Sequence, residues 1–228
     1  NNLKSWNVDK VAAVTPGQYV GFFQMFNSNS SQTPTADDFT LPVTSANFND
    51  AINEHFNPTT GNGGIQNGTY TKYGYMNTWD TSAVTDMSNV FKNGQNGNNT
   101  VNFNEDISNW DTSAVNNMSS MFNDASGFNQ DISGWNLGSV TSIAGMFKGA
   151  ATFKNASVSM EDWLATPNAS LDDFTELFSG AAAFNVALTN WDTSKITNMS
   201  DMFKNANAFN QDISTWDMSS VTNTTGMF

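Results

Sequence analysis

The sequence Phe-Asn-Gln-Asp-Ile-Ser-Gly-Trp at residues 128–135 occurs nearly unchanged at 103–110 and at 209–216. The similarity continues after the Trp, because residues 111–122, Asp-Thr-Ser-Ala-Val-Asn-Asn-Met-Ser-Ser-Met-Phe, resemble 80–91. Self-similarity at a fixed spacing is typical of repeat proteins, in which each unit buries its apolar side against the next unit. The repeat therefore indicates a stacked array rather than a single globular core.

Every tryptophan of the chain falls at the same position of this repeat. These residues are Trp6, Trp79, Trp110, Trp135, Trp163, Trp191 and Trp216. In five units the repeat Phe lies 12 residues after the Trp, and in three units the next Trp lies 13 residues after that Phe, so the period is about 25 residues. Departures from this spacing are insertions. The largest adds about forty residues between Phe26 and Trp79, and a smaller one adds three between Phe147 and Trp163.

The apolar positions that follow the Trp predict a short helix in each repeat. Val115, Met118, Met121 and Phe122 have i, i+3, i+6, i+7 spacing, the stripe of a one-sided helix. Such a helix has about two turns and is too short to be stable alone, so neighbouring repeats must support it.

The residues before the Trp predict a brief strand in each repeat. Ile107, Ile132 and Ile213 are β-branched and occupy the same repeat position, so we expect them to point inward from strands that lie side by side in the stack. The predicted fold is an α/β repeat solenoid, leucine-rich-repeat-like, with one short strand and one short helix per turn and roughly seven turns.

A second repeat Phe lies seven residues before the Trp in several units, and asparagine follows it. We expect these asparagines to form a buried ladder that satisfies main-chain groups between turns. The residues are Asn104, Asn129, Asn185 and Asn210.

The repeat divides one predicted domain, residues 1–228, into three parts. Residues 1–26 form a degenerate first repeat, 27–78 a long insertion within the array, and 79–228 the regular repeats, which are loosest at 148–178. Because the sequence both starts and stops inside a repeat, we expect it to be part of a longer protein.

Composition limits the partners. The net charge is −13, from 21 acidic and 8 basic residues, which repels phosphate backbones, so we expect no nucleic acid. Cysteine is absent, which excludes disulfides and thiolate metal sites. No run of 18 apolar residues occurs, so we expect no membrane insertion by this segment. The acidic, Asn-, Ser- and Thr-rich composition suits an extracellular setting, although it also fits any soluble, self-repelling surface.

The repeated string Phe-Asn-Gln-Asp-Ile-Ser-x-Trp-Asp-Thr-Ser-x-Val-Thr-Asn-Met-Ser-x-Met-Phe resembles the BspA-like leucine-rich repeats of bacterial surface proteins. Residues 79–228 have the resemblance directly, whereas 1–78 have only traces of it. The resemblance implies a leucine-rich-repeat-like solenoid in a cell-surface or secreted protein, with adhesion or binding roles. It supplies no catalytic residues and no ligand.

Long insertions in solenoids often form the binding face. The insertion at 27–78 contains Tyr70, Tyr73 and Tyr75, and tyrosine offers a flat apolar face with a polar tip, which suits sugars or peptides. These tyrosines are candidate ligand-binding residues. The alternative is that the segment forms a strand or hairpin that packs within its own insertion.

Positions that vary between repeats are the second candidate site, because we expect them near an exposed face. They are Glu105, Gln130 and Gln211 in one row, and Asn109, Asn190 and Thr215 in the next. Plain drift at solvent-exposed positions would produce the same variation.

No catalytic group is expected. His55 is the only histidine, and we expect it to be an incidental loop residue. Most acidic residues recur in rows, whereas catalysis by carboxylates needs one special pair. No metal site or cofactor is expected, although rows of Asp and Ser leave Ca²⁺ open. Thr81, Thr112 and Thr193 also leave open a flat threonine array of the ice-binding type.

The sequence thus favours a monomeric, non-catalytic binding or adhesion module of a bacterial cell-surface or secreted protein. We expect it to recognise a glycan or protein on another cell or host surface through the solenoid face and the 27–78 insertion. A structural spacer that projects another domain from the cell surface, with or without stabilising cations, is the main alternative. An enzyme that uses paired carboxylates is the third.

Overall fold

The computed structural model describes residues 43–56, 65–66, 69–70, 73, 76–95, 99–165 and 170–228, with the backbone alone at 65–66 and 69–70. The chain divides into two compact units, Asn1–Leu41 and Pro42–Phe228. The first unit, and with it the degenerate repeat predicted at 1–26, lies outside the described residues. All described residues belong to the second unit.

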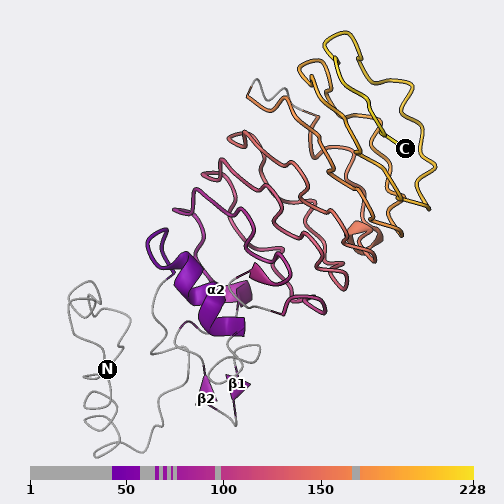
Figure 1. The fold of residues 1–228 in the computed structure, drawn as a ribbon. Coiled ribbons are helices and arrows are strands. Elements are labelled where there is room, and N and C mark those ends of the chain that lie inside the picture. The colour runs from indigo at the N-terminus through magenta and orange to yellow at the C-terminus, as the bar shows by residue number, and fades with distance from the viewer. Residues whose placement is uncertain are drawn as a thin grey trace, which may run out of the picture. The chain divides into compact units, whose positions relative to one another are not determined.

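Residues 79–228 form a stack of coils, each of which begins at a repeat Trp (Figure 1). The coils are coil 1 (79–109), coil 2 (110–134), coil 3 (135–162), coil 4 (163–190), coil 5 (191–215) and coil 6 (216–228). Parallel bridges link equivalent positions of neighbouring coils, in the series Asp86–Asn117–Ser142 and Asp173–Asn198–Asn223.

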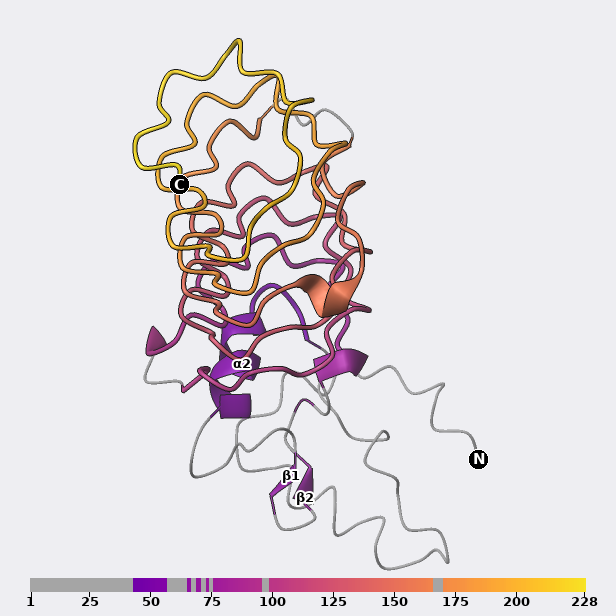
Figure 2. The same ribbon diagram turned by 90° about the vertical axis from the view of Figure 1, so that its right-hand side faces the viewer.

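Main-chain hydrogen bonds between coils recur at every second residue after the bridge. In coil 2 the N–H groups of Met118, Ser120 and Phe122 donate to carbonyls of coil 3 at 2.9, 2.9 and 2.8 Å. Figure 2 shows the resulting parallel paths of successive coils. Because each coil satisfies the donors of the one before it, no coil has a complete set of hydrogen bonds alone.

The segment predicted as a short helix forms successive turns instead. Ser120 has φ 54° and Asp124 has φ 58°, in the left-handed region, which an α-helix does not contain. Their N–H groups bond the next coil rather than a carbonyl four residues back. Met118, Met121 and Phe122 are nevertheless fully buried, as predicted.

The brief strand predicted before each Trp is also replaced. Ile107 and Ile132 are fully buried and Ile213 is half-buried, but none of them lies in a strand. The coils pair after the Trp, at the bridge positions, and not before it. Before the Trp, Asp-x-Ser turns direct main-chain N–H groups to the side chain of their own Asp.

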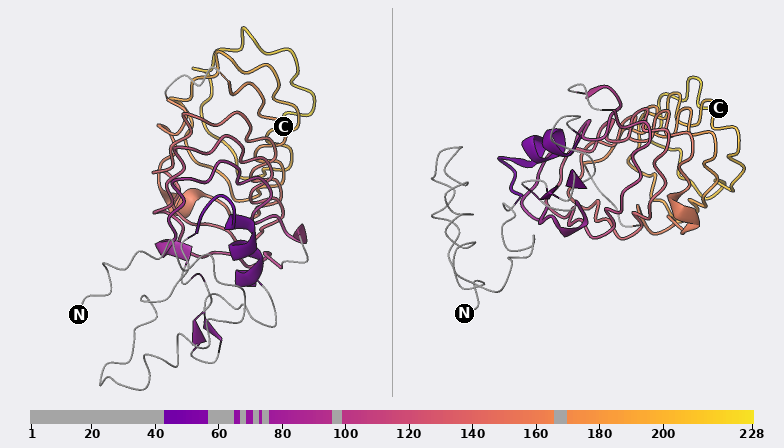
Figure 3. Two further views of the ribbon diagram at one scale, coloured as in Figure 1. Left: turned by 90° about the vertical axis from the view of Figure 1, so that its left-hand side faces the viewer. Right: turned by 90° about the horizontal axis from the view of Figure 1, so that it is seen from below.

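Figure 3 shows the backbone of the stack from two further directions. Columns of aromatic side chains fill its interior. In coil 2, Phe122 stacks on Phe128 at 3.8 Å and on Phe147 of coil 3 at 5.5 Å between ring centroids. Trp110 and Trp135 lie 6.4 Å apart with 3° between their ring planes. Aromatic rings bury large apolar areas, so these columns are the core.

A helix, α2 (Phe48–Phe56), covers the first coil and belongs to the predicted insertion. Phe48 meets the ring of Trp79 edge-on at 6.3 Å, and Phe56 meets Phe91 at 6.1 Å. The described part of 27–78 also contains the antiparallel pair β1 (Ile65–Gln66) and β2 (Thr69–Tyr70), and the 3₁₀ turn η4 (Met76–Thr78). This insertion therefore closes one end of the aromatic columns.

His55 is a buried helix residue and not the loop residue that we expected. Its Nε2 lies 2.7 Å from Oε1 of Glu105, and its ring meets Trp79 edge-on at 6.2 Å. The buried face of the helix consists of Phe48, Ala51, Ile52 and His55. His55 is buried because it lies seven residues after Phe48, on the same face of the helix.

Candidate binding site

Three kinds of side chain tie neighbouring coils together. The first is the Thr two residues after the Trp. Thr81, Thr112 and Thr193 are buried, and each hydroxyl donates to the carbonyl of the residue after the next Trp, at 2.9, 3.0 and 3.1 Å. Their burial rules out the flat exposed threonine array considered above. The residue at this position is Leu137 in coil 3 and Ala165 in coil 4, and neither has a hydroxyl, so this tie is missing between coils 3 and 4 and between coils 4 and 5.

The second tie is the Asn after the second repeat Phe. Oδ1 of Asn104 accepts the N–H of Asn129 at 2.8 Å, and Oδ1 of Asn185 accepts the N–H of Asn210 at 2.9 Å. The predicted ladder thus exists, but its members are half-buried or exposed and not buried. In coil 3 the residue is Lys154, which has no amide oxygen to accept the N–H of Asn185.

The third tie is the ring N–H of the Trp. Trp110, Trp135, Trp191 and Trp216 donate to the carbonyl three residues before the preceding Trp, at 2.8, 3.2, 2.8 and 3.1 Å. Among the described residues, two tryptophans have a buried ring N–H without a partner. One is Trp79, which begins the first coil. The other is Trp163, in the middle of the stack.

The ring of Trp163 is also tilted within its column, 6.3 Å from Trp191 between ring centroids. It makes 40° with Trp191, whereas Trp110 makes 3° with Trp135, and Trp191 makes 7° with Trp216. Between coils 3 and 4 the Thr and Asn ties are therefore absent and the ring N–H of Trp163 is unused, and the Thr tie is absent between coils 4 and 5 as well.

A three-residue insertion explains this departure. The 3₁₀ turn η6 (Asn155–Ser157) lengthens the path from the second repeat Phe to Trp163, and it is the short helical ribbon that stands out from coil 3 in Figure 2. Its residues have φ 50°, 49° and 69°. Asn155 is fully buried, and its Oδ1 accepts the N–H of Ile132 at 2.8 Å while its Nδ2 donates to the carbonyl of Val158 at 3.2 Å. These hydrogen bonds stabilise the left-handed turn.

Two hollows lie at this junction, and each one adjoins a position where a tie residue has been replaced. The Trp pocket has a volume of about 150 Å³ and is lined by Trp135, Asn136, Leu137, Gly138, Asp162, Trp163 and Leu164. The side groove has a volume of about 410 Å³ and is lined by Lys154, Ser157, Val158, Ser159, Glu161, Ala183, Asn185, Val186 and Ala187.

Polar groups of both signs surround the hollows. In the Trp pocket, Oδ1 of Asp162 accepts from Nδ2 of Asn190 at a long 3.4 Å. In the side groove, the Glu161 carboxylate accepts from the hydroxyl of Thr189, while Lys154 is exposed and forms no ion pair within the described part of the chain. The site can therefore offer hydrogen-bond donors and acceptors to a ligand.

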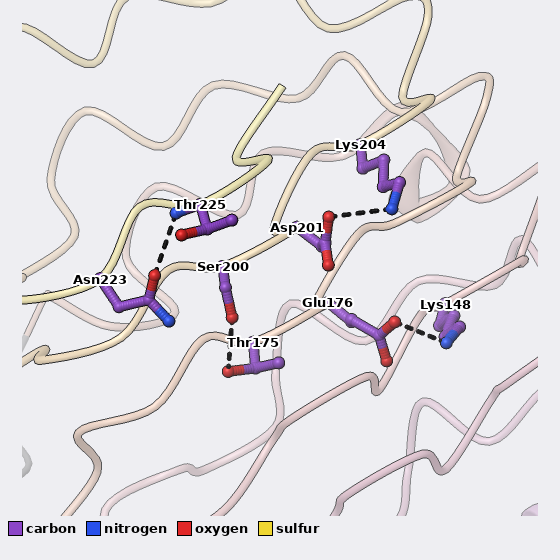
Figure 4. Close-up of polar contacts among 8 residues, drawn as sticks. All are labelled: Lys148, Thr175, Glu176, Ser200, Asp201, Lys204, Asn223 and Thr225. Atoms are coloured by element: carbon purple, nitrogen blue, oxygen red, sulfur yellow. Dashed lines mark hydrogen bonds and ion pairs between the residues drawn. The ribbon is translucent and has the colours of Figure 1, made fainter.

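The other side of the same junction is closed. Gly145 N–H donates to the carbonyl of Thr175 at 2.8 Å, and Nζ of Lys148 lies 2.6 Å from Oε1 of Glu176 (Figure 4). Figure 4 also shows the next coils joined by Thr175 and Ser200, whose hydroxyl oxygens are 3.4 Å apart. Coils 3 and 4 are thus firmly joined, and the hollows are local features.

The tyrosine candidates do not form an exposed cluster in the described residues. Tyr73 is 4% exposed, and its ring meets Trp79 edge-on at 6.4 Å, because the Trp at the end of the column needs cover. The backbone of Tyr70 lies in β2, in agreement with the hairpin alternative, and its side chain lies outside the described residues. Tyr75 lies outside them as well.

The variable-row candidates are spread along the stack, and most of them join coils. Glu105 is held by His55. Nε2 of Gln130 donates to the carbonyl of Asn104 at 2.7 Å, and Nε2 of Gln211 donates to Oδ1 of Asn185 at 2.9 Å. Those partners explain why polar residues of this length occur there.

Three candidates remain in the second variable row. The hydroxyl of Thr215 donates to the carbonyl of Thr189 at 2.8 Å, and Asn109 is exposed in coil 1. Asn190 is the one candidate that reaches the junction, through its bond to Asp162.

The rows of Asp are engaged with their own repeats. Six repeated Asp carboxylates each accept hydrogen bonds from the hydroxyl and the main-chain N–H of the Ser two residues later. They are Asp80, Asp106, Asp111, Asp192, Asp212 and Asp217. The hydroxyl lowers the carboxyl pKa more than the main-chain N–H does, except at Asp106. These bonds hold the pKa of each carboxyl below the ordinary aspartate range. In the described ranges no three His, Asp or Glu side chains gather as a metal site would require.

Sequence reasoning missed the junction, although a signal was present. Leu137 and Lys154 replace residues that are otherwise repeated, and the spacing between Phe147 and Trp163 is three residues too long. The longer spacing indicates an insertion, but it predicts no role for Leu137 or Lys154. Only the hydrogen bonds of the neighbouring coils show what the replaced residues do.

The family model described as "Mycoplasma protein of unknown function, DUF285" matches residues 64–169 and, a second time, 160–228. The chain belongs to this family. The first match covers coils 1–3 and the second covers coils 4–6, so the two copies of the family domain meet at the junction that contains the hollows. Comparison with curated proteins and with solved structures gave no match. Within the described residues, no helix has the length and apolar character needed to cross a bilayer.

Proposed function

We propose that this chain is a non-catalytic binding module of a bacterial surface or secreted protein, a leucine-rich-repeat-like solenoid that binds a glycan or protein at the junction of coils 3 and 4. The observation that carries the proposal is that two hollows lie where coils 3 and 4 lack the Asn tie and where the ring N–H of Trp163 is unused. Family membership and the resemblance to bacterial surface repeats support the extracellular setting.

The non-catalytic assignment rests on the state of the reactive groups. The histidine is buried and held by Glu105, and the repeated carboxylates accept hydrogen bonds from their own serines. A general acid or base needs to be within hydrogen-bond reach of substrate, which the buried His55 does not offer. Strained left-handed residues such as Asn155 and Ala156 occur next to the side groove, and backbone strain of this kind is commonly found at ligand sites.

Glycan and peptide arrays test the proposal. A deletion of residues 155–157 restores the 25-residue period, and we expect it to abolish binding while the coils remain folded. Ala187→Trp, which fills the side groove from its wall, provides a second variant if the deletion does not fold. Asn109→Ala is the matched control on a regular coil, and binding should persist. Loss of binding in the control, with binding kept in the junction variants, would refute the proposed site.

A structural spacer is the second candidate. The aromatic columns and the main-chain ladder, which continue along coils 1–6, favour it because a spacer needs stiffness. A spacer would bind nothing on either array, and filling the side groove would have no effect on attachment.

A further inference from the structure

The side groove lies between two contacts that join coils 3 and 4. At one end the ring of Phe153 stacks on Phe184 at 6.0 Å between centroids, and at the other end the hydroxyl of Thr189 donates to the Glu161 carboxylate. Between these contacts coil 3 has seven residues and coil 4 has four. The longer path of coil 3 contains η6, so the two chains follow different paths here and the groove lies between them.

One end of the groove lacks an acceptor oxygen. At three other junctions the main-chain N–H after the second repeat Phe donates to Oδ1 of the Asn one coil earlier, and the donors Asn129, Lys154 and Asn210 do so at 2.8, 2.9 and 2.9 Å. Asn185 keeps the same arrangement towards coil 5, since its Oδ1 accepts the N–H of Asn210. Its own N–H is therefore directed at residue 154, where Lys replaces Asn, and it has no hydrogen bond among the described residues. Because Lys154 and Asn185 both line the groove, this donor faces it.

The same end of the groove has a positive charge. Lys154 is exposed and forms no ion pair in the described part of the chain, whereas Lys148 and Lys204 are paired with carboxylates. In a protein with a net charge of −13, a free ammonium beside an unused N–H is a local site for an anion. A carboxylate oxygen at the place that Asn Oδ1 occupies in other coils can accept from both donors.

The middle of the groove is apolar. Val158 is 40% exposed there, and Met218 and Phe228 are the only other large apolar side chains that are exposed in the described residues. Val186 and Ala187 belong to the wall formed by coil 4. None of the residues that line the groove is aromatic, so it offers no ring on which a sugar could stack. An aliphatic side chain, in contrast, can lie against the two valines.

The order of these groups along the chain favours one kind of carboxylate. Val186 directly follows Asn185, so the apolar wall begins next to the donor pair. A ligand therefore needs its aliphatic group close to its carboxylate, as in the last residue of a peptide, where one Cα holds both. A phosphate fits less well, because its second negative charge would have a single cation, Lys154, and the carboxylate of Glu161 in the same groove.

We propose that the side groove binds the C-terminus of a peptide whose last residue is aliphatic. The terminal carboxylate accepts from Nζ of Lys154 and from the N–H of Asn185, and the last side chain lies against Val158 and Val186. The peptide leaves towards Glu161, whose carboxylate can accept a main-chain N–H. A volume of about 410 Å³ suits the last few residues of a chain and not a folded domain. This inference rests on the proposed function, since it names the partner chemistry at the same junction.

The test uses the whole chain and acetylated tripeptides that end in valine, leucine or alanine, each as the free acid and as the C-terminal amide. Nuclear magnetic resonance follows the main-chain N–H of Asn185 and the methyl groups of Val158. The acids should shift these signals, and the amides should bind roughly tenfold more weakly because they lack the charge. Lys154→Met should weaken binding of the acids by a similar factor, whereas Lys154→Arg, which keeps the charge, should retain it.

Lys92→Met is the matched control, because Lys92 lies in coil 1, forms no ion pair within the described residues and does not line the groove. It should leave peptide binding unchanged. A ligand whose binding Ala187→Trp abolishes and Lys154→Met leaves unchanged would overturn this inference and keep the proposed function. Glucuronic acid that shifts the Asn185 signal when no peptide does would also overturn the peptide inference alone. Signals that no probe moves, together with blank arrays, would overturn both.

Discussion

The junction between coils 2 and 3 and the junction between coils 3 and 4 are built from the same repeat, yet they differ in what joins them. At the first, Thr112 donates to the carbonyl of Asn136 and Oδ1 of Asn129 accepts the N–H of Lys154, while the ring N–H of Trp135 is used by the carbonyl of Ile107. At the second, Leu137 and Lys154 replace two of the tie residues, and the N–H of Trp163 is unused. Tie residues thus decide whether a junction is closed, while the apolar columns pass through both.

The comparison also separates two roles within one chain. The aromatic columns are continuous across the altered junction, since Phe147 and Phe178 stack at 5.5 Å with 4° between their planes. Stability therefore depends on the columns, and the ties are free to vary where the core does not need them. The two matches to the family model, residues 64–169 and 160–228, overlap beside this junction.

The largest expected effect is on the columns. Phe122→Ala removes a fully buried ring that stacks on Phe91, Phe128 and Phe147, and large-to-small changes of this kind cost about 3–5 kcal/mol. Urea unfolding followed by circular dichroism measures the loss. Phe228→Ala is the control, because that side chain is 72% exposed, and it should change the unfolding free energy by less than about 1 kcal/mol. Equal effects of the two substitutions would contradict the column description.

The next effect compares a used tie with an unused one. Trp110→Phe and Trp163→Phe remove the same part of the side chain, but only the first leaves a carbonyl, that of Met76, without its donor. We expect Trp110→Phe to cost about 1–2 kcal/mol more than Trp163→Phe in the same urea experiment. If the losses are equal, the ring N–H does not tie the coils and the junctions do not differ in the way described.

A smaller effect on the stability of the fold is expected at acidic pH. The carboxyls of the Asp rows have a lowered pKa in the folded protein because of their Ser hydrogen bonds, so they stabilise the fold above about pH 4 and lose this contribution as the pH falls through the folded pKa. The melting temperature should decline between pH 5 and pH 3. These groups are solvent-exposed, so the decline should be modest. Asp111→Asn keeps an acceptor oxygen without the titration, and it should flatten the decline slightly. A melting temperature that rises on acidification would contradict this explanation.

The sequence predicted the periodicity and the buried positions well, because both follow directly from residue spacing. Met118, Met121 and Phe122 are inside as expected, yet the helix predicted from them is absent. The i, i+3, i+6, i+7 pattern arises equally from successive turns, and choosing between the two requires knowing that Ser120 donates to the next coil. That bond involves a residue in another repeat, so no window of a single repeat contains the information.

The site was beyond local reasoning for a related reason. Exposed variable residues were expected to bind ligands, but Gln130 and Gln211 are used to join coils. Leu137 and Lys154, for which the sequence predicts no role, line the hollows. A replaced tie is visible in the sequence only after the tie itself has been recognised in the structure.

The smallest expected effect on stability is at residue 154, in the junction between coils 3 and 4. Lys154→Asn restores the amide oxygen that the N–H of Asn185 lacks, as Asn104 supplies it to Asn129, and one such bond would stabilise the fold by about 0.5–1 kcal/mol. The gain requires residue 154 to approach Asn185 as closely as Asn104 approaches Asn129, and η6, which follows residue 154 directly, changes the backbone path there. We therefore expect the full gain only when residues 155–157 are also deleted, which a double-mutant cycle in urea measures as a coupling free energy. A full gain from Lys154→Asn alone would mean that the side chain, and not the insertion, opens the junction.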